Sequence, residues 1–175
     1  MKPYIIAFIG NKEVYDSETV LKKLLAEFEK LFGSGLSDVL SDFPVFYCGG
    51  YGRFSQIASE AIDTFRQRHP EIQSKKLFIT PYLAPSYLKT NEYMREFYDE
   101  IIYPPLENVP LKFAISRRNQ WMIDRCNLLI AYMENPCGNT RKCVEYAVRK
   151  DKIVIFVDSG KRERALHCFR REKES

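Results

Sequence analysis

Short apolar stretches alternate with amphipathic stretches along most of this chain. The apolar stretches contain β-branched and aromatic residues and end at glycine, proline or polar residues, which is typical of buried strands. They predict strands at residues 2–9, 44–47, 77–80, 100–103, 127–133 and 152–157. Helical spacing of hydrophobic residues predicts helices at 17–33, 54–65, 113–125 and 140–150, the first capped by Asp16 or Ser17.

The segment 82–97 is aromatic and irregular, and it predicts at most a short helix near 91–97. It fits either a lid or a packed surface insertion. The tail from Lys161 is compatible with a final peripheral helix.

This alternation predicts a single Rossmann-like domain over residues 1–175, a three-layer α/β/α fold with a mostly parallel sheet of about six strands. Right-handed crossovers place the carboxyl ends of such strands on one edge, and ligands bind at that edge. The turns after the strands are therefore the places to look for a site.

The composition is that of a globular protein, with 175 residues, 45% hydrophobic and 29% charged. The apolar stretches are too short to span a bilayer, and the first residues do not form a signal peptide, so we expect a cytoplasmic protein. The five cysteines form no CxxC pair, and neither of the two histidines has a ligand partner at metal-binding spacing. We expect no disulfide framework, no metal and no cofactor.

The net charge of +4 comes from basic residues that are spread along the chain, apart from a cluster in the tail. A nucleic-acid binder usually carries a dense basic stripe. The sequence therefore indicates that nucleic acid is an unlikely partner, and that the basic tail is a solvated helix face.

Two glycine-bearing turns between a strand and a helix are candidates for binding a phosphate. The first holds Gly49, Gly50, Gly52 and Arg53, and the second holds Asn135, Gly138, Asn139 and Thr140. Glycine lets the backbone approach a phosphate, and a helix start offers free N–H groups and a positive dipole end. The alternative for each is a plain tight turn, and Cys137 has no nearby histidine that would favour a nucleophilic role.

Further candidates come from the other predicted strand ends. Arg117 and Arg118 point to different sides of one helix, so one of them can clamp a phosphate while the other faces water or an acidic neighbour. Gly10 and Asn11 close the first strand, and Thr80 closes the third.

The order of these motifs resembles the SLOG superfamily, which includes the LOG nucleotide phosphoribohydrolases, the DprA-type proteins and the YpsA-like proteins. The glycine turn, the stretch from Arg118 to Ala131 and the Gly-x-Thr helix start carry the resemblance, which covers residues 4–157 and is closest to the YpsA-like branch. It implies a Rossmann-like fold, a nucleotide-type ligand and a tendency to form homo-oligomers.

The resemblance also bears on catalysis. The arginine that LOG enzymes use falls on Arg118, the candidate catalytic residue, whereas their glutamate falls on Cys143. Glu145 is two residues further and faces elsewhere on a helix. The resemblance thus implies a binding platform without the hydrolytic carboxylate.

We therefore expect a protein that binds a nucleotide or a nucleotide-derived phosphorylated ligand, as sensor, carrier or sequestering module. One alternative is a LOG-like hydrolase of nucleoside monophosphates, in which Asp99, Glu100 or Glu134 would have to lie beside the ribose. A second alternative is DprA-like binding of single-stranded DNA.

Overall fold

The computed structural model describes residues 2–33, 43–83, 85–134 and 138–158. It contains six strands: β1 (Pro3–Gly10), β2 (Phe43–Cys48), β3 (Lys75–Ile79), β4 (Glu100–Ile102), β5 (Leu128–Tyr132) and β6 (Ile153–Phe156). The helices are α1 (Ser17–Phe28), the π-helical turn η1 (Glu29–Gly33), α2 (Arg53–Arg68), α3 (Pro85–Met94), the 3-10 turn η3 (Leu111–Phe113), α4 (Ala114–Arg125) and α5 (Gly138–Arg149).

All six strands are parallel and form one sheet in the order β4-β3-β2-β1-β5-β6. The chain winds outward from β1 in one direction and, after β4, crosses over to β5 on the other side of β1. The sheet therefore has a topological switch point between β1 and β5, where open α/β sheets bind their ligands. The predicted Rossmann-like three-layer fold is confirmed.

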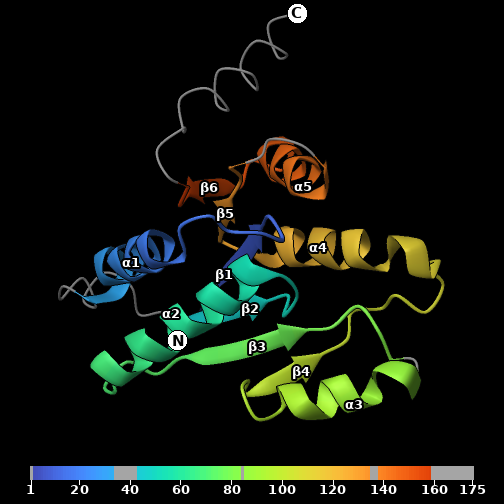
Figure 1. Cartoon of the computed structure of the whole chain (residues 1–175), viewed down its shortest axis with the longest axis horizontal. Helices are drawn as coiled ribbons and strands as arrows, with labels where there is room; N and C mark the ends of the chain where they lie inside the picture. The colour runs from blue at the N-terminus through green and yellow to red at the C-terminus, as the bar shows by residue number, and fades with distance from the viewer. Residues whose placement is uncertain (1, 34–42, 84, 135–137, 159–175) are drawn as a thin grey trace, which may run out of the picture.

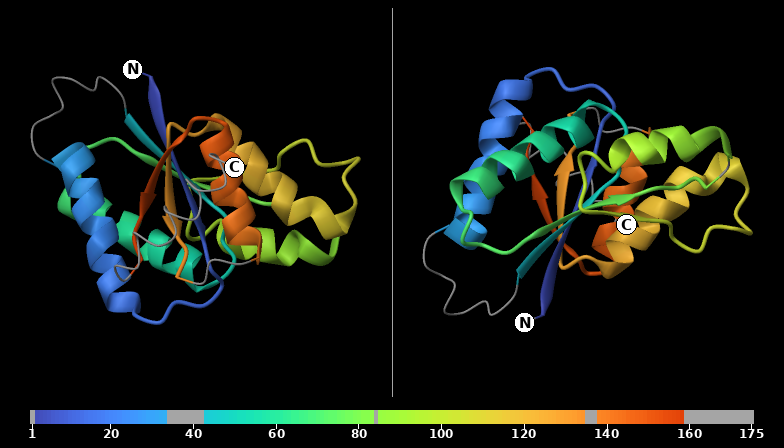
Figure 2. Two further views of the ribbon diagram at one scale, coloured as in Figure 1. Left: turned by 90° about the horizontal axis from the view of Figure 1, so that it is seen from above. Right: turned by 90° about the horizontal axis from the view of Figure 1, so that it is seen from below.

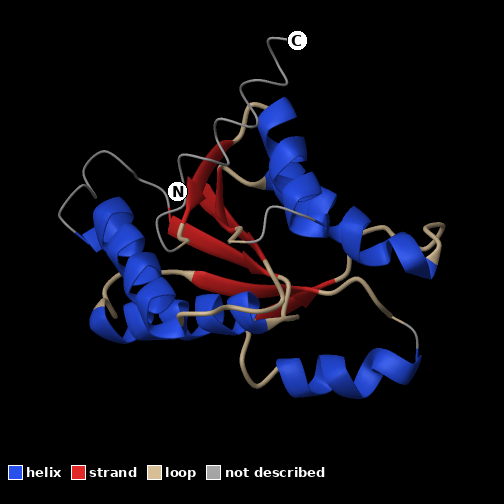
Figure 3. Ribbon diagram, turned by 45° about the horizontal axis from the view of Figure 1, so that its top comes forward, coloured by secondary structure: helices blue, strands red, loops and turns tan. Residues whose placement is uncertain are grey.

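Helices cover both faces of the sheet, as the views in Figures 2 and 3 show. Alternate strand residues face opposite sides, so Ile6 and Phe8 pack with α1 and α2, whereas Ala7 and Ile9 pack with α4 and α5. Both faces of the central strands are thus buried, which explains why their sequences are apolar without a period of two.

The predicted strands agree with the observed ones to within two residues, and Asp16 is the cap of α1, where its side chain accepts a hydrogen bond from the Thr19 amide at 3.1 Å. The segment 82–97 differs from its prediction, because α3 begins at Pro85 and ends at Met94. Proline fits the first turn of a helix, where its missing N–H has no intrahelical role. Figure 1 shows α3 beside β4, at one end of the sheet.

In the part of the chain that the structure describes, no helix is both long and apolar enough to cross a membrane. The predicted tail helix and Asn135 lie outside the described residues.

Candidate functional site

A cavity of about 580 Å³ lies at the carboxyl edge of the sheet, next to the switch point. The arrow of β3 points toward this edge in Figure 1. The cavity is lined by the last residues of β1, by residues that follow β1 and β2, and by the amino-terminal parts of α2, α4 and α5: Phe8, Ile9, Gly10, Asn11, Lys12, Gly49, Tyr51, Gly52, Ser55, Ile115, Arg118, Asn119, Asn139 and Thr140. Its volume is in the range of small-molecule pockets.

Arg118 forms the inner wall of this cavity. Its side chain comes from α4, is 3% exposed, and donates from Nη1 to the carbonyl oxygens of Gly49 at 2.9 Å and Ile79 at 2.7 Å. Its Nε donates to Asn119 Oδ1 at 2.8 Å, which fixes the plane of the guanidinium. The arginine therefore joins α4 to the carboxyl ends of β2 and β3.

The charge of Arg118 is not balanced by a carboxylate among the described residues, because its hydrogen-bond acceptors are neutral. Burial lowers the pKa of Arg118 to about 10, which still leaves the guanidinium charged at neutral pH. A buried cation that has only neutral partners attracts an anion strongly, since little water screens it.

The cavity as a whole is suited to an anion. Lys12 also lines it, and its exposed ammonium group has no acidic partner in the described part of the chain. No Asp or Glu is among the lining residues. Two cations and no carboxylate give the cavity a positive potential.

The turn between β2 and α2 supplies backbone groups. Gly52 is the N-cap of α2 with φ +83°, a conformation that favours glycine, and the amide of Arg53 donates to the Lys12 carbonyl at 2.8 Å. The next two amides, of Phe54 and Ser55, have no acceptor among the described residues. These free N–H groups and the dipole of α2 favour an anion beside Ser55.

Gly49 is required for a different reason. A Cβ atom at this position would lie 3.1 Å from both terminal nitrogens of Arg118. A side chain at this position would therefore force the guanidinium to shift by a few tenths of an ångström.

The start of α5 forms the opposite wall. Thr140 is buried, Asn139 is exposed, and both line the cavity. Residues of both glycine turns thus line the same cavity, although Gly138 is not among the lining residues.

Besides Gly138, four of the predicted site residues do not line the cavity. Gly50 packs against the ring of Phe78, and the Arg53 side chain reaches Ser17 and Gln56 on the outside of α2. Thr80 is buried and bonds to Asn91 Oδ1, while Arg117 is exposed and bonds to Gln120. Of the adjacent arginines, the structure therefore selects Arg118.

The candidate carboxylates for hydrolysis are not in the cavity. Asp99 and Glu100 lie at the amino end of β4, at the opposite edge, where they pair with Arg66 at 2.9 Å and Lys75 at 2.6 Å. Glu134 accepts a hydrogen bond from the Tyr132 hydroxyl. Parallel strands separate their two ends, so residues at the start of β4 cannot reach the carboxyl edge.

Cys143, at the place of the hydrolase glutamate, lies beneath the cavity and receives a hydrogen bond from Asn119 Nδ2 at 3.6 Å. Burial raises the pKa of this thiol, so it stays protonated at neutral pH and is a poor nucleophile. Among the described residues, no group of three His, Cys, Asp or Glu side chains is arranged to hold a metal ion.

The sequence analysis did not select several lining residues, of which Ser55, Asn119 and Ile115 are the clearest. Ser55 has a signal in the sequence, because it lies in the first turn of a helix that follows a glycine turn. Asn119 and Ile115 have none, since their membership depends on how α4 is rotated against the sheet.

Sequence comparison gives no relatives, because no family model and no curated protein matches the chain. Comparison of structures gives DNA processing protein A from Streptococcus pneumoniae, with a TM-score of 0.53 and 16% identity over 89% of this chain and 50% of that chain. The same protein from Helicobacter pylori, whose structure describes a single-stranded DNA binding mode, has a TM-score of 0.56 and 15% identity over 89% of this chain and 65% of that chain.

These similarities establish the fold, which is the Rossmann-like one expected from the SLOG resemblance. The chain spans 50% and 65% of the lengths of the two proteins. Neither protein bears on the YpsA-like branch.

The expectation that nucleic acid is an unlikely partner is wrong. It was based on the lack of a dense basic stripe, yet the Helicobacter pylori protein of similar fold binds single-stranded DNA. Single strands are held by local phosphate contacts and by base stacking on aromatic rings, and these do not require such a stripe.

Proposed function

We propose that the cavity binds a nucleotide unit through its phosphate, and that single-stranded DNA is the ligand that presents this unit. The observation that carries the proposal is the buried Arg118, which faces a cavity without acidic residues and has only neutral partners among the described residues. The phosphate would lie between this guanidinium and the free amides of Phe54 and Ser55, with Lys12 nearby.

Single-stranded DNA is favoured by the similarity to a protein with that binding mode. Lys12, an exposed cation, also lines the cavity and can contact a neighbouring phosphate. A DNA backbone held by a few such contacts has an affinity that falls with salt. The logarithm of the binding constant falls with the logarithm of the salt concentration, with a slope of about −0.7 per phosphate neutralised.

A free nucleotide is the second candidate, and the size of the cavity favours it. A volume of about 580 Å³ is that of a site for one small molecule. The same groups would then hold the phosphate of a nucleoside monophosphate. The finer assignment to the YpsA-like branch, whose ligands would be of this second type, stays a prediction.

Binding has more support than hydrolysis. Cleavage of a glycosidic bond needs an acid, a base or a carboxylate beside the ribose. The described lining residues include none, and the protonated thiol of Cys143 does not replace one.

The test measures binding of a labelled thymidine 12-mer by fluorescence anisotropy and of thymidine monophosphate by calorimetry. Arg118→Met should weaken binding roughly ten- to hundredfold, since a charge-assisted hydrogen bond contributes about 1.5–3 kcal/mol. Arg117→Met is the matched control, because it removes the same charge from the adjacent, exposed position.

Binding of the 12-mer that depends on Arg118 and on salt supports the proposal, and binding of the monophosphate alone favours the second candidate. If neither ligand binds, or if both variants lose the same affinity, the cavity does not bind phosphate through Arg118 and the proposal fails.

A further inference from the structure

Three tyrosine rings lie one after another from the cavity toward α3, and we call Tyr51, Tyr82 and Tyr87 the tyrosine row. Tyr51 lines the cavity, and its ring centroid lies 5.8 Å from the Arg118 guanidinium carbon. The Tyr82 ring follows at 6.4 Å from that of Tyr51, at an interplanar angle of 72°. Tyr87, on α3, stacks on Tyr82 with the centroids 4.2 Å apart and the planes at 18°.

The middle of the row is held rigidly by buried polar groups. Asn91 Nδ2 donates to the Tyr82 carbonyl at 3.2 Å. The Thr80 hydroxyl lies 3.2 Å from both the Tyr82 carbonyl and Asn91 Oδ1, and its single hydrogen is donated to one of these two acceptors. Thr80 and Asn91 are 0% and 8% exposed. A buried polar network of this kind fixes the backbone that carries the ring, so the row is preorganised.

The rings are nevertheless accessible to a ligand in part. Tyr51 packs against the hydrophobic core on one side, and Tyr51, Tyr82 and Tyr87 are each partly exposed. Partly exposed, rigid aromatic rings beside a phosphate-binding cavity are typical of the surfaces on which single-stranded bases stack.

The charges around the row point to stacking rather than to a further phosphate site. The exposed side chains of α3 and of the turn that follows it include Lys89 and Arg95 but also Glu92 and Glu96, which balance their charge. A ligand that continues from the cavity across α3 would therefore gain affinity there from its bases more than from its backbone.

We propose that the tyrosine row is a second subsite, which stacks against a base adjoining the nucleotide unit held in the cavity. This inference depends on the proposed function, because the cavity must hold one unit of a single strand before the row can receive its neighbour. It assigns the segment 82–97 a role in binding nucleic acid and predicts that affinity rises when the ligand grows from one nucleotide to several.

The experiment compares thymidine monophosphate with thymidine oligonucleotides of increasing length, for the full chain and the variants Tyr87→Leu and Tyr82→Leu. We expect either variant to weaken binding of a hexamer about tenfold, the usual size of a lost base–aromatic stack, while binding of the monophosphate is unchanged. The salt dependence should also stay unchanged, because no phosphate contact is lost.

Tyr93→Leu is the matched control, since Tyr93 is on the same helix, is 57% exposed and packs against Phe97 outside the row. If the row variants bind the hexamer as the unaltered protein does while Arg118→Met does not, the row is not a subsite but the proposed function stands. If the row variants lose the monophosphate and the hexamer equally, the rings act on the structure of the cavity and the inference is overturned. If Arg118→Met binds both ligands normally, the proposed function itself fails.

Discussion

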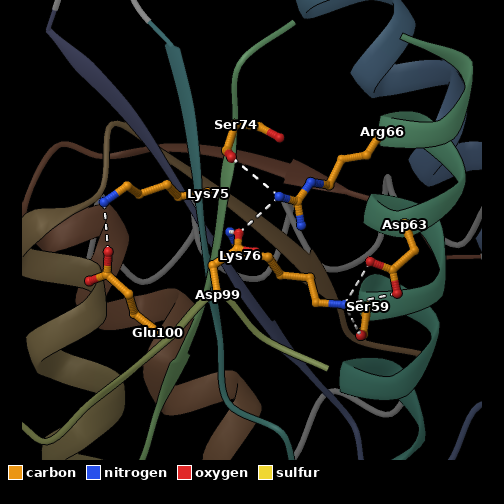
Figure 4. A network of polar contacts seen from close by, with 8 residues as sticks. All are labelled: Ser59, Asp63, Arg66, Ser74, Lys75, Lys76, Asp99 and Glu100. Carbon is orange, nitrogen blue, oxygen red and sulfur yellow. Dashed lines mark hydrogen bonds and ion pairs between the residues drawn. The ribbon is translucent and has the colours of Figure 1, made fainter. Parts of the chain in front are cut away.

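Two buried cations, Lys76 and Arg118, lie at opposite edges of this sheet, and they differ in whether a carboxylate balances their charge. Lys76 lies near the amino end of β3 and is fully buried, whereas Arg118 lies at the carboxyl edge and is 3% exposed. Lys76 Nζ bonds to both Asp63 oxygens, at 2.8 and 2.9 Å, and to Ser59 Oγ at 2.9 Å, and it lies over the ring of Tyr98. Figure 4 shows the lysine reaching from β3 to Asp63 and Ser59 on α2.

The surroundings of Lys76 extend this pairing. Arg66 donates to Asp99 at 2.9 Å, and Asp99 in turn accepts a hydrogen bond from the Lys76 amide at 2.8 Å. Lys76 and Arg66 thus each have a carboxylate partner. Because these charges balance one another, the pairs offer no unbalanced charge to a ligand.

Arg118 has no carboxylate of this kind among the described residues, and a cavity lies beside it. Burial of a cation therefore does not by itself indicate a binding site. The indication is the lack of a balancing charge together with a space in which an anion can supply it.

The largest effect on stability is expected at the paired cation. Asp63→Ala leaves the buried ammonium of Lys76 with only Ser59 and the Tyr98 ring, and it should lower the free energy of unfolding by about 3 kcal/mol. Lys76→Met should cost clearly less, because the Asp63 side chain is 47% exposed and can be hydrated when it loses its partner. Urea denaturation measures both. If both variants lose the same free energy of unfolding, an unpaired Lys76 costs no more than an unpaired Asp63, which contradicts the prediction.

The next largest effect is expected at Arg118. Inorganic phosphate at ten times its Kd should add about 1.4 kcal/mol to the stability of the protein, which raises its melting temperature by a few degrees. Arg118→Met should abolish this increase, and Lys76→Met should retain it, because the charge of Lys76 is already balanced. Calorimetric scans with and without phosphate provide the measurement. If phosphate still raises the melting temperature of Arg118→Met, the phosphate is not bound through Arg118.

His69 is a third residue that is paired with carboxylates, and its charge depends on pH. It lies nearer the surface than Lys76 does. The hydrogen bond to Glu29, at 2.9 Å, raises the pKa of His69, and a second one to Glu71 acts in the same direction. A raised pKa in the folded state means that stability is gained at low pH and is lost as the pH rises through that pKa.

The unaltered protein should therefore exceed Glu29→Gln in melting temperature by more at about pH 6 than at about pH 9. The difference should be small, because both carboxylates are partly exposed and hydrated. A difference that grows toward alkaline pH would contradict the pairing.

The smallest effect is expected at the neutral neighbour of Arg118. The Tyr51 hydroxyl is buried and lies beside the Thr80 side chain, with which it makes no hydrogen bond of ordinary geometry, so Tyr51→Phe should change the free energy of unfolding little. Tyr132→Phe is the matched comparison, because its buried hydroxyl bonds to Glu134, and it should cost about 1 kcal/mol. Chemical denaturation measures the free energy of unfolding of both variants. A loss in Tyr51→Phe as large as that in Tyr132→Phe would contradict the prediction.

Much of the fold could be predicted from local features of the sequence, namely its hydrophobic patterns, helix caps and turn residues. Apolar residues without alternation specify strands buried on both faces, and Asp16 caps a helix because its side chain reaches an amide three residues on. The two glycine turns and Gly10 could be assigned to one edge because parallel strands all end on the same side. The segment 82–97 resisted prediction, since its aromatic residues lack a clear helical period and its helix begins at a proline.

The sequence by itself thus determined the order of strands and helices along the chain, the layered class of the fold and the edge at which the candidate cavity lies. Only the tertiary structure decided that Arg118 rather than Arg117 faces the cavity, that Lys76 is balanced by Asp63, and that Asn119 and Ser55 join the site. The physical reason is that these outcomes depend on strand order, on the rotation of each helix against the sheet and on distances between residues far apart in the chain. Local propensities and spacings contain no information on such distances.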